Sequence, residues 1–306
     1  MAFAAAYLRL SEIEWRRRLA ETRELLRSCR VCPRHCDVNR LEGKVGACRV
    51  GPEPVVSSCG PHFGEEAPLV GKGGSGTIFL TSCNLRCIFC QNYDISHLAQ
   101  GAEVTVEALA RMMVSLQQQG CHNINWVSPT HQVPALLAGL EVARRQGLRR
   151  PIVYNTGGYD SVATLRQLDG VVDIYLPDAK YSDNAVGECL TEVADYWDRC
   201  REALTEMHRQ VGDLTLEDGL AVRGMLVRHL VLPEGQAGTA EVMRFLASLS
   251  RDTYVNVMAQ YRPCSEARTV REIDRRPTRA EVDEAVEAAL DAGLHRLDQR
   301  RRVAGS

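Results

Sequence analysis

Three cysteines lie within eight residues in the run Thr81-Ser-Cys83-Asn-Leu-Arg-Cys87-Ile-Phe-Cys90. The spacing CxxxCxxC lets three thiolates wrap one face of a cubane iron–sulfur cluster, which normally takes four cysteine ligands. With no obvious fourth cysteine, one iron keeps an open position, and an open metal position is a reactive one. The alternative is a structural zinc knuckle that lacks its fourth ligand, although zinc sites usually come as paired CxxC elements.

A second group of cysteines lies nearer the start of the chain: Cys29, Cys32, Cys36 and Cys48. Four thiols in a segment too polar to form a core predict a tetrahedral set around one ion or a second cluster. Glycines at 43, 46 and 51 allow the tight turns that return the fourth cysteine to the first three. The candidates for this centre are a second [4Fe–4S] cluster and zinc, and the remaining interpretation is four reduced, unligated thiols.

The composition of the 306 residues excludes several classes of protein. With 45% hydrophobic and 25% charged residues the chain is globular, and its net charge of −2 gives no reason to expect nucleic acid or an anionic membrane as partner. The apolar opening, residues 1–8, is shorter than the ~20 residues of a membrane span, and no signal peptide is expected. We therefore expect a cytoplasmic protein, in which twelve cysteines indicate metal binding rather than disulfides.

After residue 76, short apolar runs alternate with longer amphipathic segments. The predicted strands are 77–82, 123–128, 152–156, 172–176, 225–232 and 254–259. The predicted helices in this part are 104–120, 133–147, 160–169, 185–210, 239–250 and 279–293, and a further helix is predicted before it at 7–30. Six strand–helix units predict an α/β fold whose parallel sheet is either open or curved into part of a barrel. In both architectures ligands bind at the carboxyl ends of the strands, and the cysteine triad directly follows the first strand.

The sequence resembles the radical S-adenosylmethionine enzymes, which share CxxxCxΦC with an aromatic residue before the third cysteine, here Phe89. Within that superfamily it is most similar to the homologue group of the pyruvate formate-lyase-activating enzymes. The stretches that carry this resemblance are 29–36, 74–77, 83–92, 122–125, 128–131, 154–159, 175–180, 207–213, 227–233 and 254–261. The resemblance implies a partial (β/α)6 TIM-like barrel at 71–306, preceded by an N-terminal helix and cysteine-rich unit at 1–70.

The resemblance also implies the chemistry of the triad. Cys83, Cys87 and Cys90 would hold a [4Fe–4S] cluster, and S-adenosylmethionine would bind the fourth iron through its amino and carboxylate groups. One electron from the reduced cluster would then yield methionine and a 5′-deoxyadenosyl radical that abstracts hydrogen from a substrate. Phe89 would flank the adenine, or else it is an ordinary core aromatic.

Further contacts to S-adenosylmethionine are expected after the third and fourth strands. Activating enzymes carry an Asp-x-Lys that matches Asp178 and Lys180, whose alternative role is a surface ion pair. They also hold a polar pair near the methionine carboxylate that matches Asn155 and Thr156, with Asn155 where those enzymes carry Asp beside a monovalent cation.

The second strand departs from the superfamily, which often carries Gly-Gly-Glu there to bind the methionine amino group. Ser128, Thr130 and His131 supply acceptors in this chain, unless the segment is only a turn with a helix cap. On the fifth strand only one of two neighbours can face the barrel interior, and Arg228 would suit a carboxylate there better than His229. Gln260 closes the sixth strand as a late cofactor contact.

The first functional hypothesis is a radical enzyme that cleaves S-adenosylmethionine and activates a glycyl radical enzyme. The alternatives are radical modification of a small molecule or peptide, and a non-catalytic iron–sulfur protein for electron transfer or sensing. Basic residues are dense before position 50. They either cover solvated helix faces or dock an acidic electron donor such as flavodoxin or ferredoxin.

Overall fold

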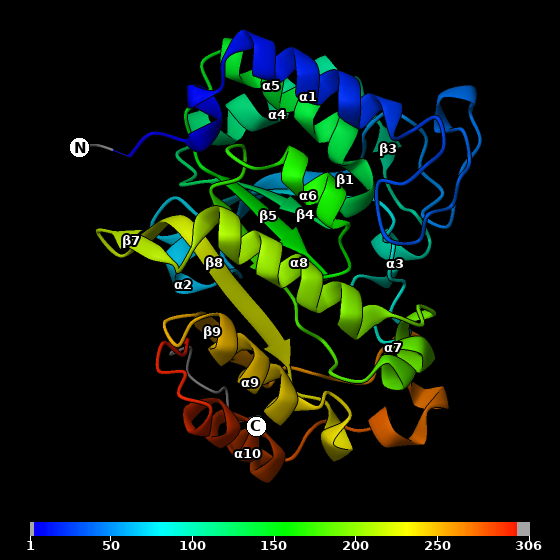
Figure 1. Ribbon diagram of the computed structural model, residues 1–306, viewed down its shortest axis with the longest axis vertical. Helices are drawn as coiled ribbons and strands as arrows, with labels where there is room; N and C mark the ends of the chain where they lie inside the picture. The colour runs from blue at the N-terminus through cyan, green and yellow to red at the C-terminus, as the bar shows by residue number, and fades with distance from the viewer. Residues whose placement is uncertain (1–2, 299–306) are drawn as a thin grey trace.

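Six parallel strands form the centre of the fold (Figure 1). The computed structural model describes residues 3–298. Residues 1–2 of the expected unit 1–70 and residues 299–306 of the expected unit 71–306 lie outside this range. The strands are β2 (Ser75–Leu80), β4 (Ile124–Val127), β5 (Ile152–Thr156), β6 (Ile174–Pro177), β8 (Leu220–Leu230) and β9 (Tyr254–Met258). They pair in that order, and each corresponds to one strand predicted from the sequence. Strands β2 and β9 do not pair in the described sheet, so the expected partial (β/α)6 barrel is confirmed.

Three further strands add antiparallel edges that the sequence pattern did not predict. They are β1 (Val55–His62) on β2, β3 (Ala102–Glu103) on β1, and β7 (Thr215–Glu217) on β8. β1 lies in a stretch rich in Gly, Pro and Cys, where the alternation of a half-buried strand is weak. The expected division at residue 70 therefore falls inside the sheet-forming part of the chain.

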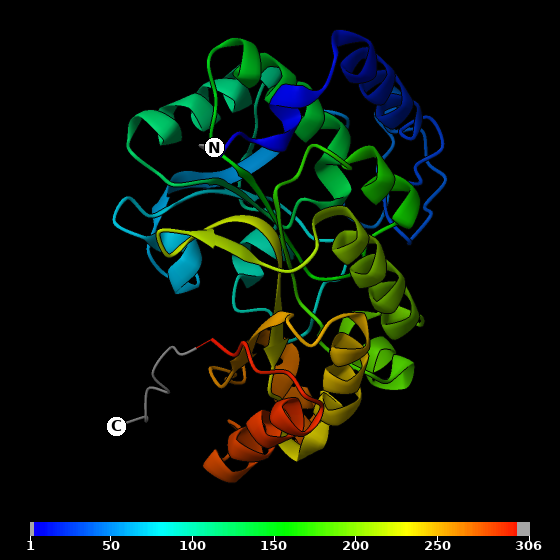
Figure 2. The ribbon, with the colours of Figure 1, turned by 60° about the vertical axis from the view of Figure 1, so that its left-hand side comes forward.

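The α-helices mostly cover the outer face of the strands, and one of them packs inside the barrel. They are α1 (Glu12–Glu24), α2 (Ala67–Val70), α3 (Tyr93–Ser96), α4 (Val106–Gln118), α5 (Val133–Arg145), α6 (Val162–Gln167), α7 (Asn184–Thr191), α8 (Tyr196–Val211), α9 (Thr239–Leu249) and α10 (Arg279–Asp291). The single helix predicted at 185–210 is two helices, because α7 ends at Glu192 in a left-handed conformation, φ 56°. In the views of Figure 1 and Figure 2, α1 lies with α4 and α5 while α9 and α10 lie at the opposite end. No helix within residues 3–298 is long and apolar enough to cross a membrane.

The barrel interior and the helix layer have separate cores. Alternate residues of β4, β5 and β6 face the helices, among them Trp126, Tyr154 and Tyr175. The opposite faces of β5, β6 and β8 form a smaller cluster with Leu69 of α2. The short helix α2 therefore packs inside the barrel, against the inward faces of β5, β6 and β8.

We expect Leu69→Ala to lower the free energy of unfolding by about 3 kcal/mol, because the fully buried side chain would leave a cavity among strand residues. Urea unfolding followed by circular dichroism measures this change. Leu290→Ala is the matched control, since Leu290 of α10 is 54% exposed and should change stability little. Equal stability of the two variants would contradict the assigned packing of α2.

Candidate functional site

The cysteine triad lies in the loop 81–92, which joins β2 to α3 at the carboxyl end of the first parallel strand. Left-handed backbone at Ser82 (φ 68°) and Arg86 (φ 57°) folds this loop tightly. The backbone N–H of Leu85 donates to Cys83 Sγ at 3.4 Å, and the Ser96 hydroxyl donates to Cys90 Sγ at 3.1 Å. Donors of this kind stabilise thiolate ligands of iron–sulfur clusters.

The three thiols lie on one tight loop, with Cys87 buried and Cys83 and Cys90 half-buried. This arrangement suits a cubane cluster, in which each thiolate binds a different iron. Burial raises the pKa of the Cys87 thiol to about 12, with Cys83 and Cys90 acting in the same direction. Coordination to iron would nevertheless deprotonate it, as metals do for bound thiols.

Asp178 and Lys180 form a half-buried ion pair beside the triad, with Lys180 Nζ 2.5 Å from Asp178 Oδ2. Burial lowers the pKa of Lys180, but the charges of Asp178 and Cys87 outweigh burial and raise it above its ordinary value. The ammonium in turn acts to lower the pKa of Cys87. A fixed positive charge therefore faces the cysteines, where it can stabilise thiolates and attract the carboxylate of a zwitterionic ligand. Contact of this pair with S-adenosylmethionine stays a prediction.

Phe89 is buried in an aromatic cluster at the same strand ends. Its ring packs edge-on against Tyr181, with centroids 6.3 Å apart, and against Tyr261, with centroids 5.6 Å apart. This is the packing of a core aromatic. Contact of Phe89 with the adenine of S-adenosylmethionine stays a prediction.

A buried carboxylate that the sequence reasoning missed organises the ends of β4 and β5. Asp160 accepts hydrogen bonds from the hydroxyls of Thr130 (2.7 Å), Thr156 (2.6 Å) and Tyr154 (2.8 Å). Burial raises the pKa of Asp160, and the three hydroxyls act against that rise. Thr130 and Thr156 both donate hydrogen bonds to Asp160, and their oxygens, 3.0 Å apart, keep lone pairs that can accept. The only sequence signal was its position, directly after the stretch 154–159.

His131 is buried next to the same strand ends. Its Nε2 lies 2.9 Å from the carbonyl oxygen of Thr81, so this nitrogen carries the proton. Burial lowers the pKa of His131 to about 4, which keeps the ring neutral at pH 7. Nδ1 is buried and has no partner within residues 3–298, so it is the acceptor of this ring. Ser128 has left-handed backbone (φ 57°), and its N–H donates to the carbonyl oxygen of Asn155.

Arg228 points to Glu66 and Asn155 inside the barrel, whereas His229 contacts Ala179 and Thr239 on the opposite side of the strand. The guanidinium of Arg228 donates to the carboxylates of Glu65 and Glu66, at 2.6 Å for Glu66 Oε2, and to Asn155 Oδ1 at 3.4 Å. Its charge is therefore already compensated by two acids from the segment before α2. Those acids were missed because their pairing with β8 is not visible in local sequence.

Gln260 lies beside the triad loop through its backbone, since its carbonyl oxygen accepts a hydrogen bond from the Gln91 side chain. Its own side chain is exposed and contacts Met258 Sδ. Among the basic residues before position 50, three donate to interior carbonyl oxygens: Arg18, Arg34 and Arg40. Three more are paired with acids on their own surface: Arg17, Arg27 and Arg30. Docking of an acidic donor stays a prediction.

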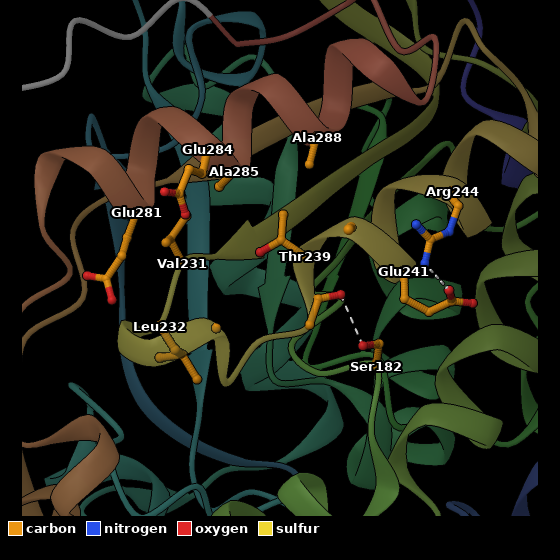
Figure 3. A pocket seen from close by; sticks show the side chains of 13 residues that line it. Ser182, Val231, Leu232, Thr239, Glu241, Arg244, Glu281, Glu284, Ala285 and Ala288 are labelled. Carbon is orange, nitrogen blue, oxygen red and sulfur yellow. Dashed lines mark hydrogen bonds and ion pairs between the residues drawn. The ribbon is translucent and has the colours of Figure 1, made fainter.

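A surface pocket lies away from these strand ends. Figure 3 shows a pocket of about 430 Å³ between α9, α10 and the segment that follows β8. Glu241 and Arg244 form an ion pair at its edge. No residue predicted to bind cluster or S-adenosylmethionine lines it, so the candidate site remains at the carboxyl ends of the strands.

Comparison with known proteins agrees with this location. Residues 69–185 match a family model described as a 4Fe-4S single cluster domain, a range that contains the triad and the Asp178–Lys180 pair. The chain is 32% identical over 276 residues to the uncharacterized protein MJ0674 of Methanocaldococcus jannaschii, which covers 87% of this chain and 75% of that protein. It is also 27% identical over 136 residues to a pyruvate formate-lyase-activating enzyme of Clostridium pasteurianum, covering 42% of this chain and 56% of the enzyme.

A similar fold occurs in the crystal structure of HydG, a maturase of the [FeFe]-hydrogenase. The TM-score is 0.51 at 12% sequence identity, and the match covers 71% of this chain. The chain spans about half of HydG, 49% of its length. This likeness shows the fold alone.

The buried ring of His229 generates a prediction about pH. Burial lowers its pKa to about 4, below the ordinary value of 6.5. Between these values the unfolded chain binds a proton that the folded chain does not, so stability falls as pH falls from about 6.5 to about 4. We expect His229→Asn to flatten this dependence by up to about 3 kcal/mol.

Urea unfolding at several pH values measures the slope. The matched control is His295→Asn, because the side chain of His295 is 61% exposed and should leave the slope unchanged. An unchanged slope in His229→Asn would show that this ring does not stay neutral in the folded protein.

Proposed function

Because the chain belongs to the radical S-adenosylmethionine superfamily, we propose that it cleaves S-adenosylmethionine at a [4Fe–4S] cluster held by Cys83, Cys87 and Cys90. The observation that carries this proposal is the position of the triad, after the first of six parallel strands and beside Asp178 and Lys180. When bound and reduced, the cluster would supply the electron that splits S-adenosylmethionine into methionine and a 5′-deoxyadenosyl radical, which abstracts hydrogen from the substrate.

The surrounding residues would bind and orient the nucleotide. Lys180 would pair with the methionine carboxylate, while Asp178 keeps the ammonium in place. The hydroxyl oxygens of Thr130 and Thr156 would accept hydrogen bonds from the methionine amino group. The buried Phe89 cluster would exclude water from the reacting atoms.

For the substrate we propose a glycine of a partner protein, which would become a glycyl radical. The partial match to a pyruvate formate-lyase-activating enzyme supports this choice. Transfer of deuterium from a glycyl radical enzyme labelled with α-deuterated glycine into 5′-deoxyadenosine tests it. Deuterium-free product, with 5′-deoxyadenosine still formed, would favour a small molecule or peptide as substrate.

After anaerobic reconstitution with iron and sulfide, we expect reduction with dithionite in the presence of S-adenosylmethionine to release 5′-deoxyadenosine, measured by chromatography. Cys87→Ala should abolish this release, because the cluster loses one of three ligands. Cys189→Ala is the matched control, since Cys189 is exposed and lies outside both cysteine groups. Full activity of Cys87→Ala, or none in a well-reconstituted parent protein, would contradict the proposed reaction.

Lys180→Met should weaken the binding of S-adenosylmethionine about tenfold, the effect of losing one charge-assisted hydrogen bond. Equilibrium dialysis against the reconstituted protein measures the dissociation constant. Lys72→Met removes an exposed ammonium away from the strand ends and serves as control. Equal affinity in both variants would remove Lys180 from the binding site.

A further inference from the structure

Four cysteines outside the triad occupy one neighbourhood. Cys29, Cys32 and Cys48 are buried and Cys36 is half-buried. Hydrogen bonds between the backbone at 29 and at 37–38, and between Ala47 N and Cys36 Sγ, bring the segments that carry these four thiols together.

Hydrogen bonds fold the backbone between these cysteines back on itself. Cys29 N donates to the carbonyl oxygen of Val38 at 2.9 Å, and Asp37 N donates back to that of Cys29 at 3.2 Å. Ala47 N then donates to Cys36 Sγ at 3.5 Å, which returns the chain to the first cysteines. A Cβ atom at Gly46 would lie 2.7 Å from both Cβ and Sγ of Cys36, so only glycine lets the backbone pass there.

A buried positive charge lies against the same thiols. Arg40 is 2% exposed, and its Nη1 lies 3.9 Å from Cys29 Sγ. In the described part of the chain its other hydrogen bonds go to the carbonyl oxygens of Gly51 and His131, and none goes to a carboxylate. A buried cation without an anionic partner is strongly unfavourable. A metal centre with four thiolate ligands is anionic and would supply that partner.

We propose that Cys29, Cys32, Cys36 and Cys48 hold a second [4Fe–4S] cluster. A cluster is favoured over zinc because the chain takes up iron and sulfide for the triad in any case, and this preference rests on the proposed function. Donors to two of the sulfurs, Ala47 N and the Arg40 guanidinium, are contacts of the kind that tune the potentials of such clusters.

The second cluster would lie next to the triad loop. Arg34, between Cys32 and Cys36 in sequence, donates to the carbonyl oxygens of Asn84 and Leu85, within the triad loop. One side chain thus connects the two cysteine groups, close enough for a one-electron exchange in which one cluster is oxidised and the other reduced. That use rests on the proposed function and on its external low-potential electron donor, whereas the site itself does not.

The triple variant Cys83→Ala/Cys87→Ala/Cys90→Ala isolates the second site in the full chain. After anaerobic reconstitution and desalting, we expect about four irons and four sulfides per chain, and an EPR signal of a reduced [4Fe–4S] cluster. Bound zinc in place of iron would overturn the cluster, and absence of both metals would overturn the site. Neither result bears on 5′-deoxyadenosine release by the parent protein, so the two proposals fail independently.

A matched glycine pair tests the geometry in the triple variant. Gly46→Ala should abolish iron binding because its methyl group displaces Cys36, whereas Gly51→Ala should retain it, since no atom lies within 4 Å of a Cβ there. With the triad intact, Gly46→Ala should still bind about four irons per chain, which shows that the protein folds. Equal iron content of the two alanine variants in the triple background would overturn the assignment.

Discussion

The partly buried guanidinium of Arg228 connects four segments of the chain inside the barrel. It lies on β8, binds Glu65 and Glu66 from the segment before α2, and donates to Asn155 of β5, while Asn256 of β9 donates to Glu66 at 2.7 Å. Charges leave water at high cost unless ion pairs and hydrogen bonds compensate them, so none of these segments can move without unpairing a charge. The network also joins β9 to the chain that leads into β2, where the strands themselves do not pair.

With the strands held in this way, their carboxyl ends meet at one edge of the sheet. The triad loop follows β2, Asp178 and Lys180 follow β6, and the Gln260 carbonyl after β9 accepts a hydrogen bond from the triad loop. Asp160 fixes the ends of β4 and β5 through three hydroxyls. The proposed radical reaction would need such fixed surroundings, because in cofactor enzymes the protein positions the cofactors and excludes competing reactions.

The cysteine-rich segment belongs to this arrangement rather than to a separate appendage. Arg34 binds carbonyl oxygens of the triad loop, Arg40 binds that of His131, and Thr164 of α6 donates to the carbonyl oxygen of Val31. β1, which follows the segment, pairs with β2 along the whole length of that strand, from Ser75 to Leu80. Arg34 therefore links the segment that carries Cys29, Cys32, Cys36 and Cys48 directly to the triad loop.

The sequence by itself determined the six parallel strands, most of the helices and the placement of the triad after the first strand. Those features depend on local periodicity and cysteine spacing, whereas Lys180 was named because Asp178 and Lys180 match the Asp-x-Lys of the activating enzymes. Only the tertiary structure decided that β1 extends the sheet, that Glu65 and Glu66 enter the barrel, and that Asp160 takes the hydroxyls of Thr130 and Thr156. These contacts join residues whose pairing depends on how distant strands and turns meet. Their energies come from burial and charge compensation, which a local pattern does not encode.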